Sequence, residues 1–171
     1  MTDTMQPSPN TSFNARRAVD FARSELFERT FKEGMALVEE AAGYLDGPGR
    51  AASKRLTRTA ALAYAGESMR LTTRLMQMAS WLLVQRAVRD GEIALLEAGS
   101  DKYRLISREP HPAATFAGSD ELPETLKTLI IRGAAIYERV RRLDETMYGE
   151  TPEAANPVSD QMAKLAAAFG R

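Results

Sequence analysis

The chain has 171 residues, with 23 Lys and Arg against 23 Asp and Glu, and no cysteine. A chain of this length forms one domain with a substantial hydrophobic core. The balanced charge argues against a protein drawn as a whole to nucleic acid or to a membrane surface. The lack of cysteine excludes disulfides, thiol nucleophiles and thiolate metal sites. There is no run of 18 apolar residues and no basic-then-apolar start, so we expect no membrane insertion and a cytoplasmic protein.

Residues 1–11 are polar and contain two prolines, which is typical of a disordered leader. A first helix is predicted over residues 12–45, with Ser12 as its N-cap. Its apolar stripe alternates spacings of four and three and comprises Phe27, Phe31, Gly34, Val38, Ala41 and Leu45. Gly47 suits the left-handed position after a helix, and Pro48 cannot continue one. This short connection predicts that the next helix runs back antiparallel.

The second predicted helix, residues 51–90, is the element around which the chain is organised. Leu62, Met69, Met76 and Leu83 recur every seven residues, and Ala65, Thr72 and Ala79 follow three places after the first three. Two such rows form a heptad seam, for which we favour a core role over an adaptable methionine surface. Such a helix, apolar nearly all round, should be buried nearly all round. At about 1.5 Å per residue it would be roughly 60 Å long, which suggests a function in surfaces and not in a pocket.

The second half of this helix carries more apolar surface than one further helix can cover. Burial across a two-fold axis is the economical solution, so we predict a homodimer. The residues predicted for its interface are Leu75, Met78, Trp81 and Leu82.

A connection is predicted over residues 91–121, either an interaction loop or a mobile one. Within it, residues 92–97 could form one more helical turn and residues 103–107 a short extended piece. A third helix is predicted over residues 122–148, with an unbroken four-three stripe made of Leu122, Leu126, Leu129, Gly133, Ile136, Val140, Leu143 and Met147. The fold class is therefore all-α, an antiparallel three-helix bundle with long helices.

The tail, residues 150–171, begins polar with two prolines and is expected to be flexible. It carries a short amphipathic stripe made of Val158, Met162, Leu165 and Phe169. A helix this short is marginal alone in water. The stripe either folds back on the bundle or docks in a partner's groove, and the polar tether favours docking.

The residues offer little catalytic chemistry. His111, the only histidine, lies between two prolines and is read as a surface residue. The paired acids Glu39–Glu40 and Asp120–Glu121 suit a polar helix face and a helix start. Since no phosphate loop, paired-histidine helix or serine elbow occurs, we predict that the protein is not an enzyme and has no cofactor and no metal.

A basic patch at residues 50–58 consists of Arg50, Lys54, Arg55 and Arg58. A solvated helix face is its favoured reading, because no aromatic residue is interleaved for base stacking. The alternative function is a small helical nucleic-acid-associated regulator that uses this patch.

With the helices placed, the stretch Arg70 to Val88 and the following Gly91, Glu92 and Ile93 resemble the RcdA family, the regulators of CtrA degradation in bacterial cell-cycle control. The resemblance extends over the whole chain, tail included. It rests on a core pattern and contains no catalytic motif.

The resemblance implies a dimeric three-helix bundle that acts as a non-enzymatic adaptor for the ClpXP protease. The implied partners are the response regulator CpdR, which primes the protease, the cyclic-di-GMP receptor PopA, and substrates such as CtrA and TacA. It also implies transient placement at a cell pole. The family supplies no agreed site residues, so the tail and interface residues above are predicted on physical grounds alone.

Overall fold

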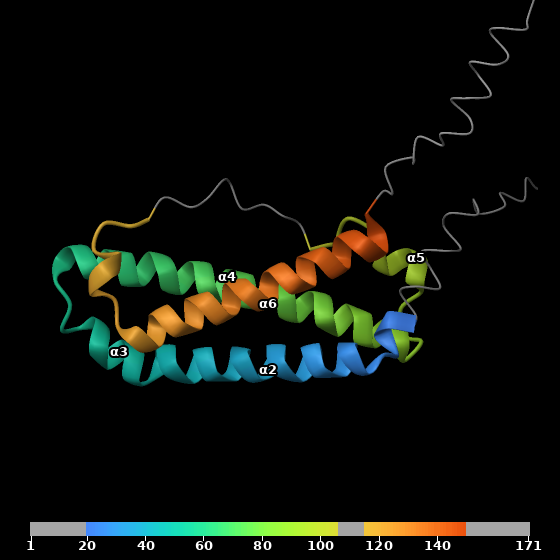
Figure 1. Ribbon diagram of the computed structural model, residues 1–171, viewed down its shortest axis with the longest axis horizontal. Helices are drawn as coiled ribbons and strands as arrows, with labels where there is room; N and C mark the ends of the chain where they lie inside the picture. Colours follow the sequence, from blue (N-terminus) through green and yellow to red (C-terminus); the bar gives the residue numbers. More distant parts are fainter. Residues whose placement is uncertain (1–19, 106–114, 150–171) are drawn as a thin grey trace, which may run out of the picture.

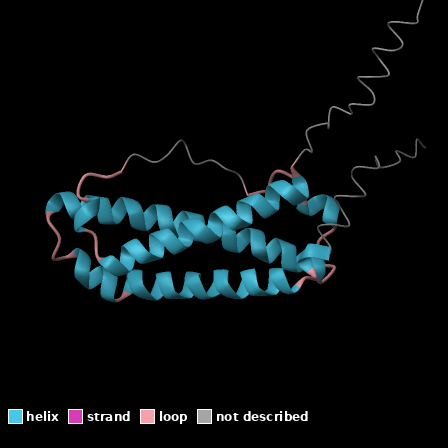
Figure 2. Ribbon diagram, in the orientation of Figure 1, coloured by secondary structure: helices cyan, strands magenta, loops and turns pink. Residues whose placement is uncertain are grey.

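The structure is a computed structural model that describes residues 20–105 and 115–149 (Figure 1). Within these two ranges the chain forms helices and no strand (Figure 2), which confirms the all-α class. In chain order the elements are α2 (Glu25–Asp46), α3 (Pro48–Ser53), α4 (Arg58–Arg89), α5 (Leu95–Ala98), the 3-10 turn η1 (Ser119–Glu121) and α6 (Glu124–Tyr148).

The three long helices α2, α4 and α6 lie side by side as the expected bundle (Figure 1). The predicted antiparallel arrangement holds for α2 and α4, since Glu28 near the start of α2 pairs with Arg89 at the end of α4. Helices α4 and α6 run parallel instead. Gly133 contacts Leu71, and 15 residues later in α6 Tyr148 bonds to Gln85, further along α4 in the same direction. The connection between them therefore carries the chain back along the bundle.

The first predicted helix, residues 12–45, is divided in the structure, and its predicted N-cap Ser12 lies outside the described residues. Residues 20–22 are helical, the chain turns at residues 23–24, and α2 starts at Glu25. Ser24 is the N-cap, because its Oγ accepts a hydrogen bond from the amide of Phe27 at 3.2 Å. The turn brings the ring of Phe21 to 5.7 Å from that of Phe27 and to 6.4 Å from that of Trp81. Apolar contact with the core thus favours the turn over a continuous helix.

The second predicted helix, residues 51–90, is divided in the structure. Gly47 has φ −108°, outside the left-handed region, and Pro48 opens the short helix α3 directly. Helix α4 begins after Thr57, whose Oγ1 accepts from the amide of Ala60 at 3.2 Å. The break lies where Thr57 offers a better helix start than continuation through residues 54–56. The sequence pattern identified the long apolar part of α4 but not this N-cap.

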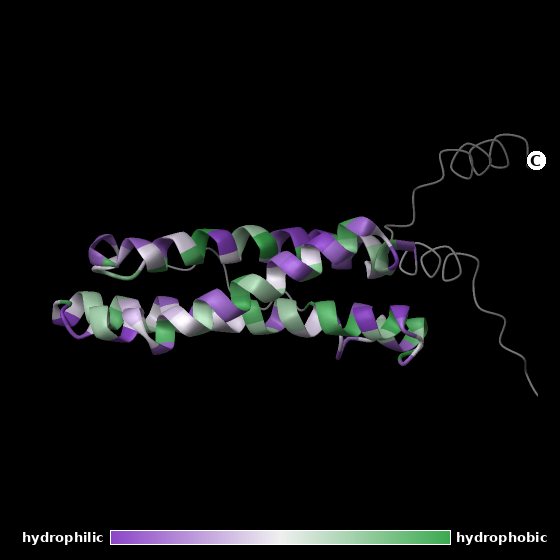
Figure 3. Cartoon of the chain, turned by 90° about the horizontal axis from the view of Figure 1, so that it is seen from below, coloured by the Kyte–Doolittle hydropathy of each residue, from purple (hydrophilic) through white to green (hydrophobic). Residues whose placement is uncertain are grey.

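The apolar stripe predicted for the third helix faces the core as expected, and all its members are buried except Leu143, which is half-buried. Two glycines allow the long helices to approach closely. A methyl group at Gly34 would lie 2.9 Å from Cδ1 of Leu82, and one at Gly133 would lie 2.7 Å from Cδ1 of Leu71. Figure 3 shows hydrophobic and hydrophilic residues alternating along the helices.

A polar cluster lies within this apolar interior. The indole Nε1 of Trp81 donates to Oδ1 of Asp144 at 2.8 Å, and the Asp144 side chain is 3 % exposed. Nε of Arg104 donates to the two carboxylate oxygens of Asp144 at 3.1 and 3.0 Å. The same guanidinium donates to the Tyr148 carbonyl oxygen at 2.8 Å, near the end of α6. The buried charge is therefore paired and hydrogen-bonded, and the segment after α5 is fixed to α6.

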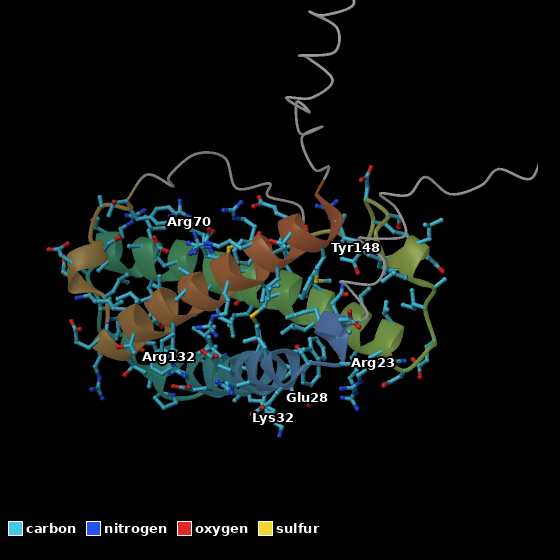
Figure 4. All side chains as sticks on the ribbon, turned by 45° about the vertical axis from the view of Figure 1, so that its right-hand side comes forward. Arg23, Glu28, Lys32, Arg70, Arg132 and Tyr148 are labelled. Carbon is cyan, nitrogen blue, oxygen red and sulfur yellow. The ribbon has the colours of Figure 1, made fainter. Side chains whose placement is uncertain are left out.

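The connection between α4 and α6 is attached to the bundle at both ends. Its first part contains α5, which overlaps the second half of the helical turn predicted over residues 92–97. Of the extended piece predicted over residues 103–107, residues 103 and 104 form a turn and a bend, and residues 106 and 107 lie outside the described residues. Its last part places Phe116 under the guanidinium of Arg70, 4.2 Å from the ring centroid, and against Gly66 (Figure 4). The predicted loop is thus a crossover connection.

Four predicted features lie outside the described residues. They are the leader 1–11, the start of the first helix at residues 12–19 with its N-cap Ser12, the proline-flanked His111, and the tail 150–171 with Val158, Met162, Leu165 and Phe169. They remain predictions.

Loss of the Arg104 guanidinium should destabilise the fold strongly. Arg104→Met leaves the buried Asp144 carboxylate without its cation, and we expect a loss of about 3 kcal/mol in the free energy of unfolding. The matched control is Arg132→Met, which breaks an exposed ion pair to Glu40 and should cost about 1 kcal/mol at most. Urea denaturation of both variants measures the difference, and equal losses would contradict a central role for the buried pair.

Candidate interaction surface

A row of large apolar side chains lies on the outer face of α4. Leu62, Met69, Met76 and Leu83 are 68 %, 71 %, 64 % and 49 % exposed. Seven residues are nearly two helical turns, so the four side chains line one side of the helix. These four residues are called the outer row below.

The middle of the outer row is flanked by small uncharged residues, whereas exposed arginines, Arg58 and Arg86, lie about one turn beyond its two ends. Ala65 and Thr72, on one side, and Thr73 and Ser80, on the other, are exposed. No long side chain stands between the row and these flanks, so another helix could approach closely, as in a heptad seam. The row lies opposite the core-facing side of α4, so about half or more of each of its side chains is left uncovered in the isolated bundle.

The structure reverses the predicted roles of the two apolar faces of α4. The side chains predicted for the dimer interface, Leu75, Met78, Trp81 and Leu82, are at most 4 % exposed. They are covered by the chain's own α2 and α6, so that prediction was wrong. The heptad seam predicted as core is the outer row, and that reading was wrong as well. The sequence shows two apolar faces, but it does not show which one the other helices cover.

The outer row differs from the other exposed apolar residues of the described chain. Leu26 on α2, Leu96 on α5 and Ile131 on α6 are exposed, but each stands alone on its own helix. Single exposed apolar residues are ordinary on protein surfaces. A row extending from Leu62 to Leu83 marks an interaction site instead.

In residues 20–105 and 115–149, Glu138 and Tyr148, whose pKa values are shifted, are held in structural hydrogen bonds. A hydrogen bond from Arg141, opposed by partial burial and aided by Arg142, lowers the pKa of Glu138 to about 2. Burial raises the pKa of Tyr148, whose hydroxyl donates to Gln85 at 2.8 Å. The first bond lies within α6, and the second joins α6 to α4.

The two acid pairs noted in the sequence, Glu39–Glu40 and Asp120–Glu121, lie on the protein surface. Glu40 accepts two hydrogen bonds from Arg132 at 2.8 Å (Figure 4), while Glu39 beside it is exposed. Asp120 and Glu121 are exposed in η1. Among residues 20–105 and 115–149 no three His, Cys, Asp or Glu side chains gather as metal ligands do. No helix in those ranges is both long and apolar enough to cross a bilayer.

The basic patch lies at the end of the bundle formed by α3 and the start of α4 (Figure 1). Arg50 pairs with Asp46 at 3.9 Å. The side chains of Lys54, Arg55 and Arg58 are exposed.

Comparison with known proteins places this fold in a family. Residues 18–169 match the model of a family described as "Protein of unknown function (DUF1465)". The crystal structure of RcdA from Caulobacter crescentus CB15 matches with 57 % sequence identity and a TM-score of 0.65, covering 78 % of this chain and 99 % of that one. The chain belongs to the RcdA family. No curated protein matches significantly.

Membership in the RcdA family confirms the resemblance inferred from residues 70–93. It supports a role for this chain as a regulator or adaptor of cell-cycle proteolysis.

The buried polar cluster was missed in the sequence, because Asp144 and Arg104 look like ordinary surface residues there. The one available signal was a tryptophan, whose buried N–H requires an acceptor.

Proposed function

We propose that the protein is a non-enzymatic adaptor that tethers cell-cycle regulators, CtrA and TacA among them, to the CpdR-primed ClpXP protease, with PopA as a further partner. Its place of action is the cytoplasm, with transient recruitment to a cell pole. Family membership supports this proposal. The structural observation beside it is the uncovered outer row, an exposed apolar face suited to a contact with another protein chain, which is assigned below to a second copy.

Tethering explains how such a bundle could act without catalytic groups. When the adaptor holds a substrate beside the protease pore, binding of the substrate to the pore becomes an intramolecular step. This can raise the apparent affinity of the protease for the substrate by a factor of about 10² to 10⁴. The bundle supplies one docking surface in this proposal, and the tail stripe Val158, Met162, Leu165 and Phe169 supplies another.

The protein acts as a homodimer in this proposal, with the outer row as the contact between copies. A two-fold axis across α4 would set Leu62, Met69, Met76 and Leu83 of one copy against the same residues of the other. The small flanking residues allow the two helices to approach closely. This places the dimer contact on the face opposite the one predicted from the sequence.

Charges placed in the outer row should separate the copies without unfolding them. In Met69→Glu/Met76→Glu both carboxylates remain in water in the single subunit, so its melting temperature should stay unchanged. Self-association should weaken on the order of a hundredfold, because two unpaired charges would be buried in the contact. Sedimentation equilibrium measures this. Ile131→Glu is the control, because it changes an isolated exposed residue of another helix. A wild-type chain that is monomeric throughout would contradict the dimer.

Removal of the tail stripe should separate partner binding from folding. Deletion of residues 158–171 should leave the melting temperature and the dimer intact, while purified CpdR-primed ClpXP degrades TacA, or CtrA with PopA present, more slowly. A full-length variant with V158S, M162S, L165S and F169S should show the same loss if the stripe, and not the length of the tail, carries the contact. Unfolding of the truncated chain would show that the tail belongs to the core. Unchanged degradation with every substrate would contradict the docking role.

A further inference from the structure

We propose that Lys54, Arg55 and Arg58 form a docking site for an acidic segment of a partner protein. This site, called the basic corner below, adjoins one end of the outer row, since Arg58 lies four residues before Leu62 on α4, but it does not depend on the proposed adaptor function. It lies at the end of the bundle where α3 leads into α4 (Figure 1).

The basic corner stands out because its cations have no partners. Within the described part of the chain, Lys54, Arg55 and Arg58 form no ion pair and no side-chain hydrogen bond, and all three are exposed. Most other arginines there are paired, for example Arg132 with Glu40 at 2.8 Å and Arg139 with Glu33 at 2.6 Å. Cations close in sequence that form no ion pair repel one another, and an anionic partner would relieve this repulsion.

The backbone holds these cations in a defined turn. The amide of Arg55 bonds to the Ala52 carbonyl at 3.0 Å, and the amide of Leu56 bonds to the Ser53 carbonyl at 3.3 Å. Leu56 packs against the core and so anchors the turn between the exposed side chains. Arg58 opens α4, where the positive end of the helix dipole adds to the potential instead of offsetting it. The arrangement is therefore a fixed positive corner.

The surroundings favour a short acidic protein segment over nucleic acid. Carboxylates lie around the basic corner: Asp46 pairs with Arg50, and Glu121 accepts a hydrogen bond from the Thr57 hydroxyl at 3.1 Å. A continuous phosphate backbone would meet these negative charges as well as the positive ones. The nearby aromatic side chains are not free to stack on bases, since Tyr64 is buried and Phe116 lies under Arg70. A few carboxylates on a loop or helix face could reach the corner between the acids.

The test measures binding of a labelled glutamate-rich peptide, and of a labelled DNA duplex of matched charge, to the full chain by fluorescence anisotropy. Lys54→Gln/Arg55→Gln/Arg58→Gln should weaken peptide binding about tenfold, because three exposed ion pairs are lost. The matched control is Arg23→Gln/Lys32→Gln. These cations are also exposed and without partners, but they lie at or near the start of α2 (Figure 4). The control should change affinity by about twofold at most.

A charge-reversed variant provides a second, independent test of the proposed site. Lys54→Glu/Arg55→Glu/Arg58→Glu should reject the glutamate-rich peptide and bind a lysine-rich one. Equal peptide affinity for the wild type and the glutamine triple variant would overturn the proposal. Tighter binding of the duplex than of the peptide, with a steep salt dependence, would assign the corner to nucleic acid instead. Loss of self-association in the glutamine variant would assign it to a second copy. None of these outcomes bears on degradation by the protease, so the two proposals fail separately.

Discussion

Asp144 accepts hydrogen bonds from Trp81 on α4 and from Arg104 in the crossover connection, inside a mostly apolar bundle. This interaction sets the rest of the structure. It holds α6 alongside α4, fixes the start of the connection to the end of α6, and turns the Trp81 face of α4 inward. A buried carboxylate is tolerated only when its partners are in place, so the cluster also penalises other registers of the two helices.

The inward turn of one α4 face leaves the other uncovered. Gly34 on α2 and Gly133 on α6 let these helices approach the inner residues of α4 closely, and together the two helices cover that face. The outer row, Leu62 to Leu83, then has no partner within the described chain. The stability of the subunit and its capacity to bind other proteins thus reside on opposite faces of one helix. This separation allows an interaction surface to change without loss of the fold.

Local sequence patterns predicted the helices well, because an alternation of four and three requires only a helix with one buried face. They predicted the third helix closely, but they missed the break before Thr57 and the turn at Ser24, which depend on caps and on contacts of Phe21. They also misassigned the faces of α4. Leu75 and Met76 are equally apolar, and which of them is covered depends on glycines and on a carboxylate located far away in the chain. Periodicity alone does not carry that information.

Methionine oxidation tests the two-faced α4 most directly. Met69, Met76 and Met78 lie on one helix, the first two on the outside of the subunit and the third in its core. Dilute and concentrated protein are treated briefly with hydrogen peroxide, and sulfoxide at each methionine is measured by mass spectrometry. Met78 should resist oxidation at both concentrations, whereas Met69 and Met76 should oxidise readily in dilute protein and become protected at high concentration. Ready oxidation of Met78, or no concentration dependence at Met69 and Met76, would contradict the account.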